Sequence, residues 1–222
     1  MHINSNTILF GRTILLVPYG KHHVKKYHTW MENDETRELT ASLPLTIDEE
    51  YEMQQTWLND KDKCTFIILS KEIFDRTHDE IESMIGDVNL FLNDLDDIHC
   101  GEIEIMIAQA TERHKGYGIE TLYTFIRYGN SRVANFIKDL FISLAIKTLN
   151  ITRFIVKIGL KNLPSIDLFT KKFQFLEIEK SEVFQETTME RRVDNDFIEL
   201  LHSKTPNYKI DSYENLIINK TV

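Results

Sequence analysis

The sequence predicts a single α/β domain in which strands and helices alternate along the chain. The chain has 222 residues, which is long enough for one domain with a substantial core. Apolar runs rich in β-branched residues alternate with segments whose apolar residues recur at helical spacing. No internal repeat or low-complexity linker interrupts this order, and mixed elements in this order are typical of one α/β domain.

The first half of the chain is predicted to contain three strands and two helices. The strands are expected at 13–19, 64–70 and 84–94. The first helix, 21–32, would place Val24, Tyr27, His28 and Met31 on one face. Thr46 and Glu49 form a capping box that begins the second helix, which continues to about residue 60. We expect 40–46 to be a loop and the charged segment 71–83 to be an exposed connection.

The second half begins with the clearest strand of the sequence, 101–109. Its residues alternate, so that one face carries isoleucines and the other carries Glu102, Glu104 and Met106. A helix is expected from Ile119 onward. Further on, the sequence predicts a strand at 152–160, a helix at 162–173 and a hairpin at 174–193. The tail from Asp194 is polar, with one short apolar patch.

Composition and charge exclude several classes of function. The net charge of −9 argues against nucleic-acid binding as the main task, because phosphate backbones need a broad basic surface. The longest apolar stretch, 140–146, is far too short to span a membrane. The two cysteines, Cys64 and Cys100, belong to no C-x-x-C pair or Cys/His array, so we expect no metal. The N-terminus lacks the order of a signal peptide, and we expect a cytoplasmic protein with reduced thiols.

Residues 112–118, ERHKGYG, form a basic turn between the strand at 101–109 and the following helix. The first backbone N–H groups of a helix lack internal partners, and the helix dipole adds positive potential there. Two glycines let the backbone approach a ligand closely, and Arg113, His114 and Lys115 add charge. A pyrophosphate would fit such a turn. The spacing alone equally allows a surface turn with solvated charges, because short glycine motifs often occur without a ligand.

Three segments together give this turn a family resemblance. RHKGYG, residues 113–118, resembles the R/Q-x-x-G-x-G/A signature of the GNAT acetyltransferases. GEIEIMIA precedes it as the family's fourth strand does, and residues 157–175 resemble the family's second acetyl-CoA segment. The run from about residue 8 to 190 is similar to RimJ/RimL-like members. The resemblance implies a GNAT fold, with a mixed, mostly antiparallel sheet of about seven strands, flanked by helices and splayed at strands four and five.

The resemblance also implies which residues bind acetyl-CoA. The turn would supply N–H groups and charge to the pyrophosphate, the fourth strand would pair with the pantetheine arm, and Asn162 would bond the cofactor. Asn162 also fits a helix N-cap with Pro164 in the first turn, and both roles can hold at once. The residues expected to bind the cofactor are Met106, Ile107, Ala108, Arg113, His114, Lys115, Gly116, Tyr117, Gly118, Asn162, Ser165 and Phe169.

Acetyl transfer requires a neutral amine, and a carboxylate can take the proton directly or through water. Glu102 and Glu104 are the best candidates, because they share one face of the strand beside the cofactor. They could equally be a solvent-facing polar edge, which is commoner, or recognise a cationic peptide without proton transfer. Many family members carry a tyrosine that protonates the leaving thiolate. The matching residue here, Phe169, cannot donate a proton.

Three residues are candidates for contact with the acceptor substrate. Asp87 and Asn89 are polar residues in an apolar strand, and Asp87 could line the acceptor site. Glu50 could contact a basic peptide residue, although helix capping alone explains an acidic residue at the start of a helix. The histidines His22, His23 and His28 have no carboxylate or thiol at ligand spacing, and we interpret them as surface or packing residues.

The domain is expected to cover residues 1–193, followed by the polar tail 194–222. Within it, 130–146 departs from the family and carries an apolar stripe at helical spacing. It is either an extra helix that packs on the domain or on a partner, or an unremoved intervening segment.

The sequence thus predicts an acetyl-CoA-dependent N-acetyltransferase that acts on a protein N-terminus. The resemblance implies tubulin as the partner. Two alternatives remain open: a non-catalytic cytoskeletal module that retains the acetyl-CoA site, and an acetyltransferase for a lysine side chain or a small amine.

Overall fold

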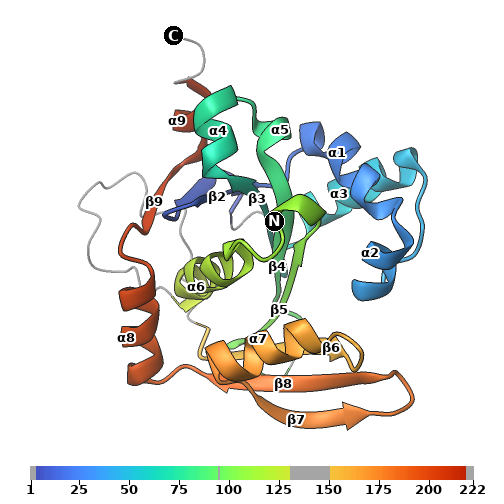
Figure 1. Ribbon diagram of the computed structural model, residues 1–222, viewed down its shortest axis with the longest axis vertical. Coiled ribbons are helices and arrows are strands. Elements are labelled where there is room, and N and C mark those ends of the chain that lie inside the picture. Colours follow the sequence, from blue (N-terminus) through green and yellow to red (C-terminus); the bar gives the residue numbers. More distant parts are fainter. Residues whose placement is uncertain (1–3, 95, 131–150, 219–222) are drawn as a thin grey trace.

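One twisted mixed sheet organises the protein, and the computed structural model describes residues 4–94, 96–130 and 151–218 of it (Figure 1). The described strands follow the order β7-β8-β6-β5-β4-β3-β2-β1-β9. Every neighbouring pair is antiparallel except β5 and β6, which are parallel. The strands are β1 (Thr7–Phe10), β2 (Ile14–Pro18), β3 (Lys63–Ser70), β4 (Met84–Phe91), β5 (Cys100–Ile107), β6 (Arg153–Gly159), β7 (Leu176–Ser181), β8 (Glu186–Arg192) and β9 (Lys209–Ser212).

Helices cover both faces of this sheet and divide the core into two parts (Figure 1). One part packs α6 and α7 against the sheet, and the other packs α1 and α3 against the opposite face. The α-helices are α1 (Val24–Met31), α2 (Asp34–Leu39), α3 (Ile47–Asn59), α4 (Lys71–Thr77), α5 (Glu80–Ser83), α6 (Tyr117–Asn130), α7 (Leu163–Phe173), α8 (Asn195–Lys204) and α9 (Tyr213–Ile218), and the short 3₁₀ helices are η1 (Lys21–His23) and η2 (Ala110–Glu112). No helix of the described ranges is both long and apolar enough to cross a bilayer.

Local sequence signals explain where several elements begin. The Thr46 hydroxyl accepts from the Glu49 backbone N–H at 3.3 Å, while the Glu49 carboxylate accepts from the Thr46 N–H at 2.7 Å. This confirms the capping box at the start of α3. The predicted strands at 13–19, 64–70, 84–94, 101–109 and 152–160 are all present, and so are the hairpin β7–β8 and the loop at 40–46.

Two segments differ from the sequence-based prediction because their apolar residues find partners far away in the chain. Residues 71–83 are not an exposed connection: they form α4 and α5, and Phe74 is buried against the core on the α1 side. Residues beyond 193 are not only a tail. Phe197 and Leu201 of α8 enter the core on the α6 side, and β9 pairs with β1. With β1 and β9 the sheet exceeds the expected seven strands.

The expectations for the insert fall almost wholly outside the described residues. Of the segment 130–146, only Asn130 is described, as the last residue of α6. Its side-chain amide donates to the Ile151 carbonyl at 2.7 Å, which ties the end of α6 to the start of β6.

Candidate active site

The sheet opens between β5 and β6, which pair only over three residues. Cys100, Gly101 and Glu102 lie opposite Arg153, Phe154 and Ile155, and beyond Glu102 the two strands diverge. Figure 1 shows β6, β7, β8 and α7 as a unit that turns away from the rest of the sheet. From Ile103 onward, the edge of β5 that faces this unit has no strand beside it in the described structure. Its backbone N–H and C=O groups can therefore pair with an extended ligand.

An arginine fixes the point at which the strands separate. Arg153, the first residue of β6, donates to Asp94 at 2.9 Å, to Asp97 at 3.0 Å and to Glu190 at 3.2 Å. These bonds attach the start of β6 to the loop before β5 and to β8. The start of β6 is therefore fixed in place where β5 and β6 begin to diverge.

The turn between β5 and α6 has the backbone of an anion site. Gly116 has a φ of +90° and His114 a φ of 64°, and both values lie in the left-handed region that favours glycine. Tyr117 and Gly118 begin α6, whose first-turn N–H groups lack intrahelical partners. Apart from Gly116 and its two chain neighbours, no heavy atom of the described structure lies within 4 Å of a Cβ built on Gly116, so there is space for a ligand in front of the turn.

The side chains of this turn are partly committed within the protein. Arg113 Nε donates to the Ile107 carbonyl at 2.9 Å, which draws the turn back onto β5. Lys115 pairs with Glu112 at 2.9 Å. The Tyr117 ring is buried in the core, with its hydroxyl 3.2 Å from Ser70 Oγ, so only its backbone can face a ligand. The sequence did not reveal this inward direction, because β3 and the turn are far apart along the chain.

Helix α7 presents its N-terminus on the other side of the opening. Asn162 is half-buried and is the N-cap: its Oδ1 accepts from the Ser165 N–H at 3.3 Å. Its side-chain NH₂ group donates to no residue in the part of the chain that the structure describes. Phe169 is 3% exposed and packs against Phe173 and Phe175, with ring centroids 6.1 and 5.1 Å away. The ring therefore belongs to the core behind the opening and supplies no proton donor.

Polar residues of three adjacent strands meet on the sheet face that α1 and α3 cover. Thr65, Asn89 and Glu104 lie opposite one another on β3, β4 and β5. The Thr65 hydroxyl donates to Asn89 Oδ1 at 2.6 Å, and Asn89 Nδ2 donates to Asp87 Oδ2 at 2.8 Å. The sheet thus brings together the sequence-predicted residues Asp87, Asn89 and Glu104. We call this group, with Glu102 and Lys63, the acceptor face.

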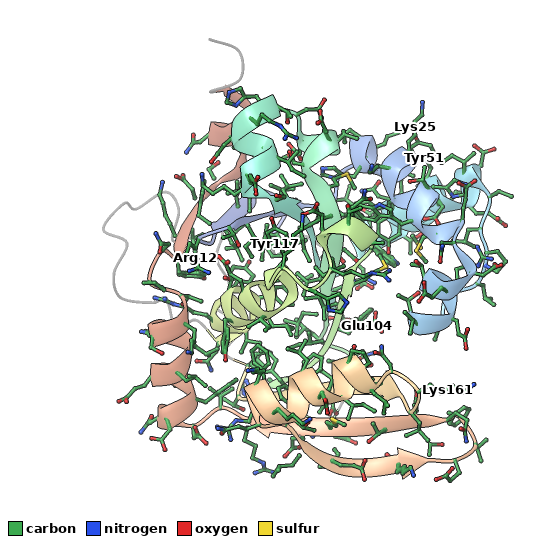
Figure 2. All side chains as sticks on the ribbon, viewed as in Figure 1. Arg12, Lys25, Tyr51, Glu104, Tyr117 and Lys161 are labelled. Carbon is green, nitrogen blue, oxygen red and sulfur yellow. The ribbon has the colours of Figure 1, made fainter. Side chains whose placement is uncertain are left out.

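The two glutamates of β5 have different surroundings. Glu102 is 12% exposed and pairs with Lys157 of β6 at 2.9 Å. Glu104 is exposed and makes no ion pair within the described residues. Surrounding protein atoms raise the pKa of Glu104, Lys63 lowers it, and the negative charges of Asp87 and Glu102 raise it further. In Figure 2, Glu104 lies between the helices α1–α3 and the unit formed by β6 and α7. A raised pKa in an open position is what a general base near neutral pH requires.

Asp87 is a buried carboxyl on the same face. Burial raises its pKa to about 6, against the opposing effects of the Asn89 hydrogen bond, the charge of Lys63 and the Tyr27 hydroxyl. Because Asp87 is held by neighbouring groups and shielded from solvent, it is placed to orient Asn89 and Tyr27.

Glu50 lies beneath this face and not at the exposed end of α3. It is 1% exposed, and burial raises its pKa, while His28 opposes this shift from 3.7 Å. Its Oε2 and the hydroxyl of Tyr19 have no hydrogen-bond partner among the described residues. Buried oxygens of this kind are normally satisfied by water or a ligand. Glu49, by contrast, is the exposed capping residue, so capping does not explain Glu50.

Lys63 is a residue that the sequence analysis missed. It is the first residue of β3 and is 3% exposed, with Nζ 3.2 Å from the Trp57 ring centroid and 4.1 Å from that of Phe91. Burial lowers its pKa to about 8. A lysine beside an apolar run gives no warning of such burial, since the residues that enclose it come from α3 and β4.

One cluster in the described residues has metal-ligand chemistry, but its hydrogen bonds do not suit a metal. His22 and His23 lie 3.2 and 2.7 Å from Glu80 Oε1, a carboxylate that the sequence spacing did not bring near them. His23 Nδ1 accepts from the Gly20 N–H at 2.9 Å. In the neutral ring the proton is therefore on Nε2, where it donates to Glu80. A metal on Nε2 would need that proton on Nδ1, against the Gly20 N–H.

Comparisons with known proteins agree with this geometry. Residues 13–172 match the family model described as an acetyltransferase (GNAT) domain. The chain belongs to the GNAT acetyltransferase family. It is an N-acetyltransferase with acetyl-CoA as cosubstrate, and the predicted sheet, splayed at its fourth and fifth family strands (β5 and β6 here), is confirmed.

Several relatives are similar over most of their length. An N-acetyltransferase 9-like protein of Nematostella vectensis is 48% identical over 85% of this chain and 87% of the relative. The alpha/beta-tubulin-N-acetyltransferase 9 of Drosophila melanogaster is 43% identical over 90% of this chain and 94% of the relative. The solved Vibrio cholerae spermidine N-acetyltransferase, in complex with CoA and spermine, has a TM-score of 0.58 at 15% identity and covers 81% of this chain and 95% of its own. This last likeness shows the GNAT fold.

The residues of the opening suit acetyl-CoA. An extended pantetheine arm matches the free edge of β5, and a pyrophosphate matches the left-handed turn at the start of α6, where space is open. Met106 and Ile107 are the last residues of β5, Ala108 follows them, and the Ile107 carbonyl also accepts from Arg113. His114 and Gly116 give the turn its left-handed backbone, and Gly118 lies in the first turn of α6.

Proposed function

We propose that this N-acetyltransferase acetylates the α-amine of a protein N-terminus, and that the protein is tubulin in the cytoplasm. The observation that carries the proposal is the position of Glu104, on the acceptor face and next to the free edge of β5. The tubulin assignment rests on the similarity to the Drosophila melanogaster relative named for that substrate.

The opening can hold acetyl-CoA through backbone groups of this chain. We assign the end of the β5 edge at Met106 and Ile107, with Ala108 after it, to the pantetheine arm and the N–H groups at Gly116–Gly118 to the pyrophosphate. Arg113 and Lys115 add positive charge at the rim, and the Asn162 amide faces the arm from α7. When bound, acetyl-CoA supplies an acetyl group activated as a thioester.

Glu104 is then the group that takes a proton from the acceptor. A protein N-terminus has a pKa of roughly 7.7–8.0, so a carboxylate in the site needs to remove only one weakly held proton. The amine nitrogen forms a bond to the acetyl carbon as the C–S bond breaks, and the electron pair leaves on sulfur. Water protonates the thiolate, because Phe169 has no hydroxyl. One proton is released to solvent overall.

The acceptor face supplies the binding site for the peptide. Glu104, Asp87 and Glu50 favour a cationic peptide start. The partnerless oxygens of Glu50 and Tyr19 offer acceptor positions below it. Asn89 is fixed by Thr65 and Asp87, so its position does not have to be ordered when the peptide binds.

The test combines cofactor binding with the choice of acceptor. Calorimetry should show acetyl-CoA binding to the parent protein, and at least about tenfold weaker binding to Arg113→Glu, a loss of about 1.4 kcal/mol. Lys25→Glu is the matched control: it reverses the charge of an exposed lysine on α1, and Figure 2 shows it away from the start of α6. Equal affinity in the parent and Arg113→Glu would remove Arg113 from the cofactor site.

Mass spectrometry then identifies the acceptor atom. A peptide of the first tubulin residues should gain one acetyl group at its free α-amine, and the same peptide with a blocked N-terminus should gain none. Acetyl on an internal lysine of the blocked peptide, or on spermidine alone, would replace the α-amine with a side-chain or small-amine acceptor.

A further inference from the structure

Lys63 is a buried ammonium on the acceptor face that has no part in the acetyl transfer described above. Lysines are almost never fully buried unless they are paired. Lys63 lies between two aromatic rings, with its Nζ 3.2 Å from the centroid of Trp57 and 4.1 Å from that of Phe91. Cation–π attraction of this kind holds a desolvated ammonium in place. We call this arrangement the lysine cage.

The charged groups that face the lysine cage are carboxylates from three elements. They are Glu104 on β5, Asp87 on β4 and Asp60 at the end of α3, and each favours the ammonium form of Lys63. Among the described residues Glu104 and Asp87 form no ion pair with it. The cage therefore holds a positive charge near these two carboxylates without letting it neutralise either of them by contact.

Lys63 lies opposite Phe91 and Phe91 lies opposite Glu102, so Glu104 is the next residue of β5 on the same sheet face. An ion pair such as Glu102–Lys157, at 2.9 Å, commits the carboxylate oxygens to a donor. A charge held further away lowers the proton affinity of a carboxylate but leaves its oxygens free to accept. Lys157 on β6 acts on Glu104 in the same direction as Lys63, but it is paired with Glu102. Asp87 and Glu102 act in the opposite direction, because they are like charges nearby.

We propose that Lys63 is a positioning residue for catalysis: its caged ammonium is the counter-charge that keeps Glu104 ionised and unpaired, ready to accept the proton of the incoming amine. The proposal rests on the proposed function for the role of Glu104 as base. Lys63 neither gains nor loses a proton in the reaction. The proton of the substrate ammonium passes to a Glu104 oxygen and from there to water, while the nitrogen keeps the electron pair that attacks the acetyl carbon.

A first experiment measures the coupling without any turnover. The chain has two tryptophans, so Trp30→Phe leaves Trp57 as the single reporter beside Lys63. Its fluorescence should change with a midpoint at about pH 8, where Lys63 titrates. In the same background Lys63→Met should abolish the fluorescence transition, and this loss would show that the transition reports the titration of Lys63. Glu104→Gln should move the midpoint down by about half a unit to one unit, because a charge that favours the ammonium is lost.

A second experiment measures the pH dependence of kcat/KM for acetylation of the tubulin peptide. In Lys63→Met the acidic limb should move up by about half a unit to one unit, since coupling between two groups is reciprocal. Lys63→Arg keeps a permanent cation and should restore the limb to the parent position. Lys61→Met removes an exposed lysine two residues away and should leave the limb in place. Thermal melts and coenzyme A affinity verify that each variant is folded.

The outcomes separate the two proposals. A Trp57 transition whose midpoint is unchanged by Glu104→Gln would overturn the role of Lys63, whatever the activity. An acidic limb unmoved in a folded Lys63→Met variant would overturn it as well, because a merely structural lysine lowers the rate without shifting the limb. A midpoint that moves in a protein that acetylates no peptide would uphold the coupling and refute the proposed function.

Discussion

At the scale of single residues, Glu102 and Glu104 differ in what else binds them. Glu102 forms an ion pair with Lys157, whose Nζ lies 2.9 Å from a Glu102 oxygen. Glu104 is exposed and lies beside the hydrogen-bonded side chains of Asn89 and Asp87. Alternation along a strand places both carboxylates on one face, but it does not reveal the cation on the neighbouring strand. The assignment of the base therefore depends on the register of β5 against β6.

We predict that Glu104→Gln lowers kcat by roughly 10²-fold or more, the usual contribution of a general base. Glu102→Gln should lower it by less than about tenfold, because its loss removes an ion pair at the strand junction and no proton acceptor. Steady-state kinetics at saturating acetyl-CoA measure both. Equal losses in the two variants, with unchanged melting temperatures, would contradict the assignment of the base.

The raised pKa of Asp87 predicts how the stability of the protein depends on pH. Burial raises its pKa from 3.8 to about 6 in the folded protein. A carboxyl whose pKa is raised by folding stabilises the fold only while it is protonated, below its unfolded pKa, and this stability is lost as the pH rises through about 6. Asp87→Asn should therefore gain stability relative to the parent by roughly 2–3 kcal/mol between about pH 4 and about pH 7. Urea unfolding at both pH values measures the gain, and a constant difference would contradict the raised pKa.

Residue types and spacing predicted much of this site but not its side-chain directions. The glycines of the turn and the polar residues of β4 and β5 are where the sequence placed them. Tyr117, Glu50 and Lys63 turn inward toward Ser70, His28 and Phe91, which are distant along the chain. Such long-range partners leave no trace in local periodicity.

At the scale of elements, two helix N-termini frame the opening. Helix α6 offers backbone N–H groups after a left-handed turn, while Asn162 caps α7 through its own side chain. Asn162 Oδ1 accepts the capping hydrogen bond, and the NH₂ group of the same side chain can donate to the cofactor. Capping and cofactor binding therefore use different atoms of Asn162.

Substitutions at Asn162 separate these two roles. Asn162→Asp keeps the cap acceptor and should leave the melting temperature within about 2 °C of the parent. It should weaken acetyl-CoA binding at least about tenfold, because it removes the NH₂ donor and adds a negative charge near the cofactor. Asn162→Ala should in addition lose about 1 kcal/mol of stability. Calorimetry and thermal melts distinguish the effects, and unchanged affinity in Asn162→Asp would show that Asn162 serves as a cap alone.

Elements with strong local signals were predicted well, and elements that depend on the rest of the fold were not. The Thr46 capping box and the alternation of β5 fixed two elements from nearby residues alone. Helices α4 and α5 were missed because their segment is charged and only Phe74 is an obvious core residue. The four-residue strands β1 and β9 carry little pattern of their own: β1 is held between β2 and β9, and β9 pairs with β1.

At the scale of the whole molecule, the C-terminal segment completes the half of the sheet away from the opening (Figure 1). Strand β9 covers the edge of β1 over four paired residues. The Tyr213 hydroxyl donates to Glu80 at 2.6 Å, where His22 and His23 also converge. Tyr208 stacks under Arg127 of α6, with Cζ 4.3 Å from the ring centroid. The segment therefore holds elements from both ends of the chain together.

Removing residues 207–222 should lower the melting temperature by about 10 °C, which corresponds to roughly 3 kcal/mol for a chain of this length. The loss has three sources: the β1–β9 pairing, the Tyr208–Arg127 contact and a hydrogen bond to the buried Glu80. Tyr213→Phe removes the last of these and should account for about 1–2 kcal/mol.

The truncated protein should retain kcat/KM at low temperature, since the removed segment lies away from β5 and β6, but it should aggregate on warming because β1 becomes a free edge. Circular dichroism melts and light scattering measure the two effects. A melting temperature equal to that of the full chain would mean that residues 207–222, with β9, contribute nothing to the stability of the domain.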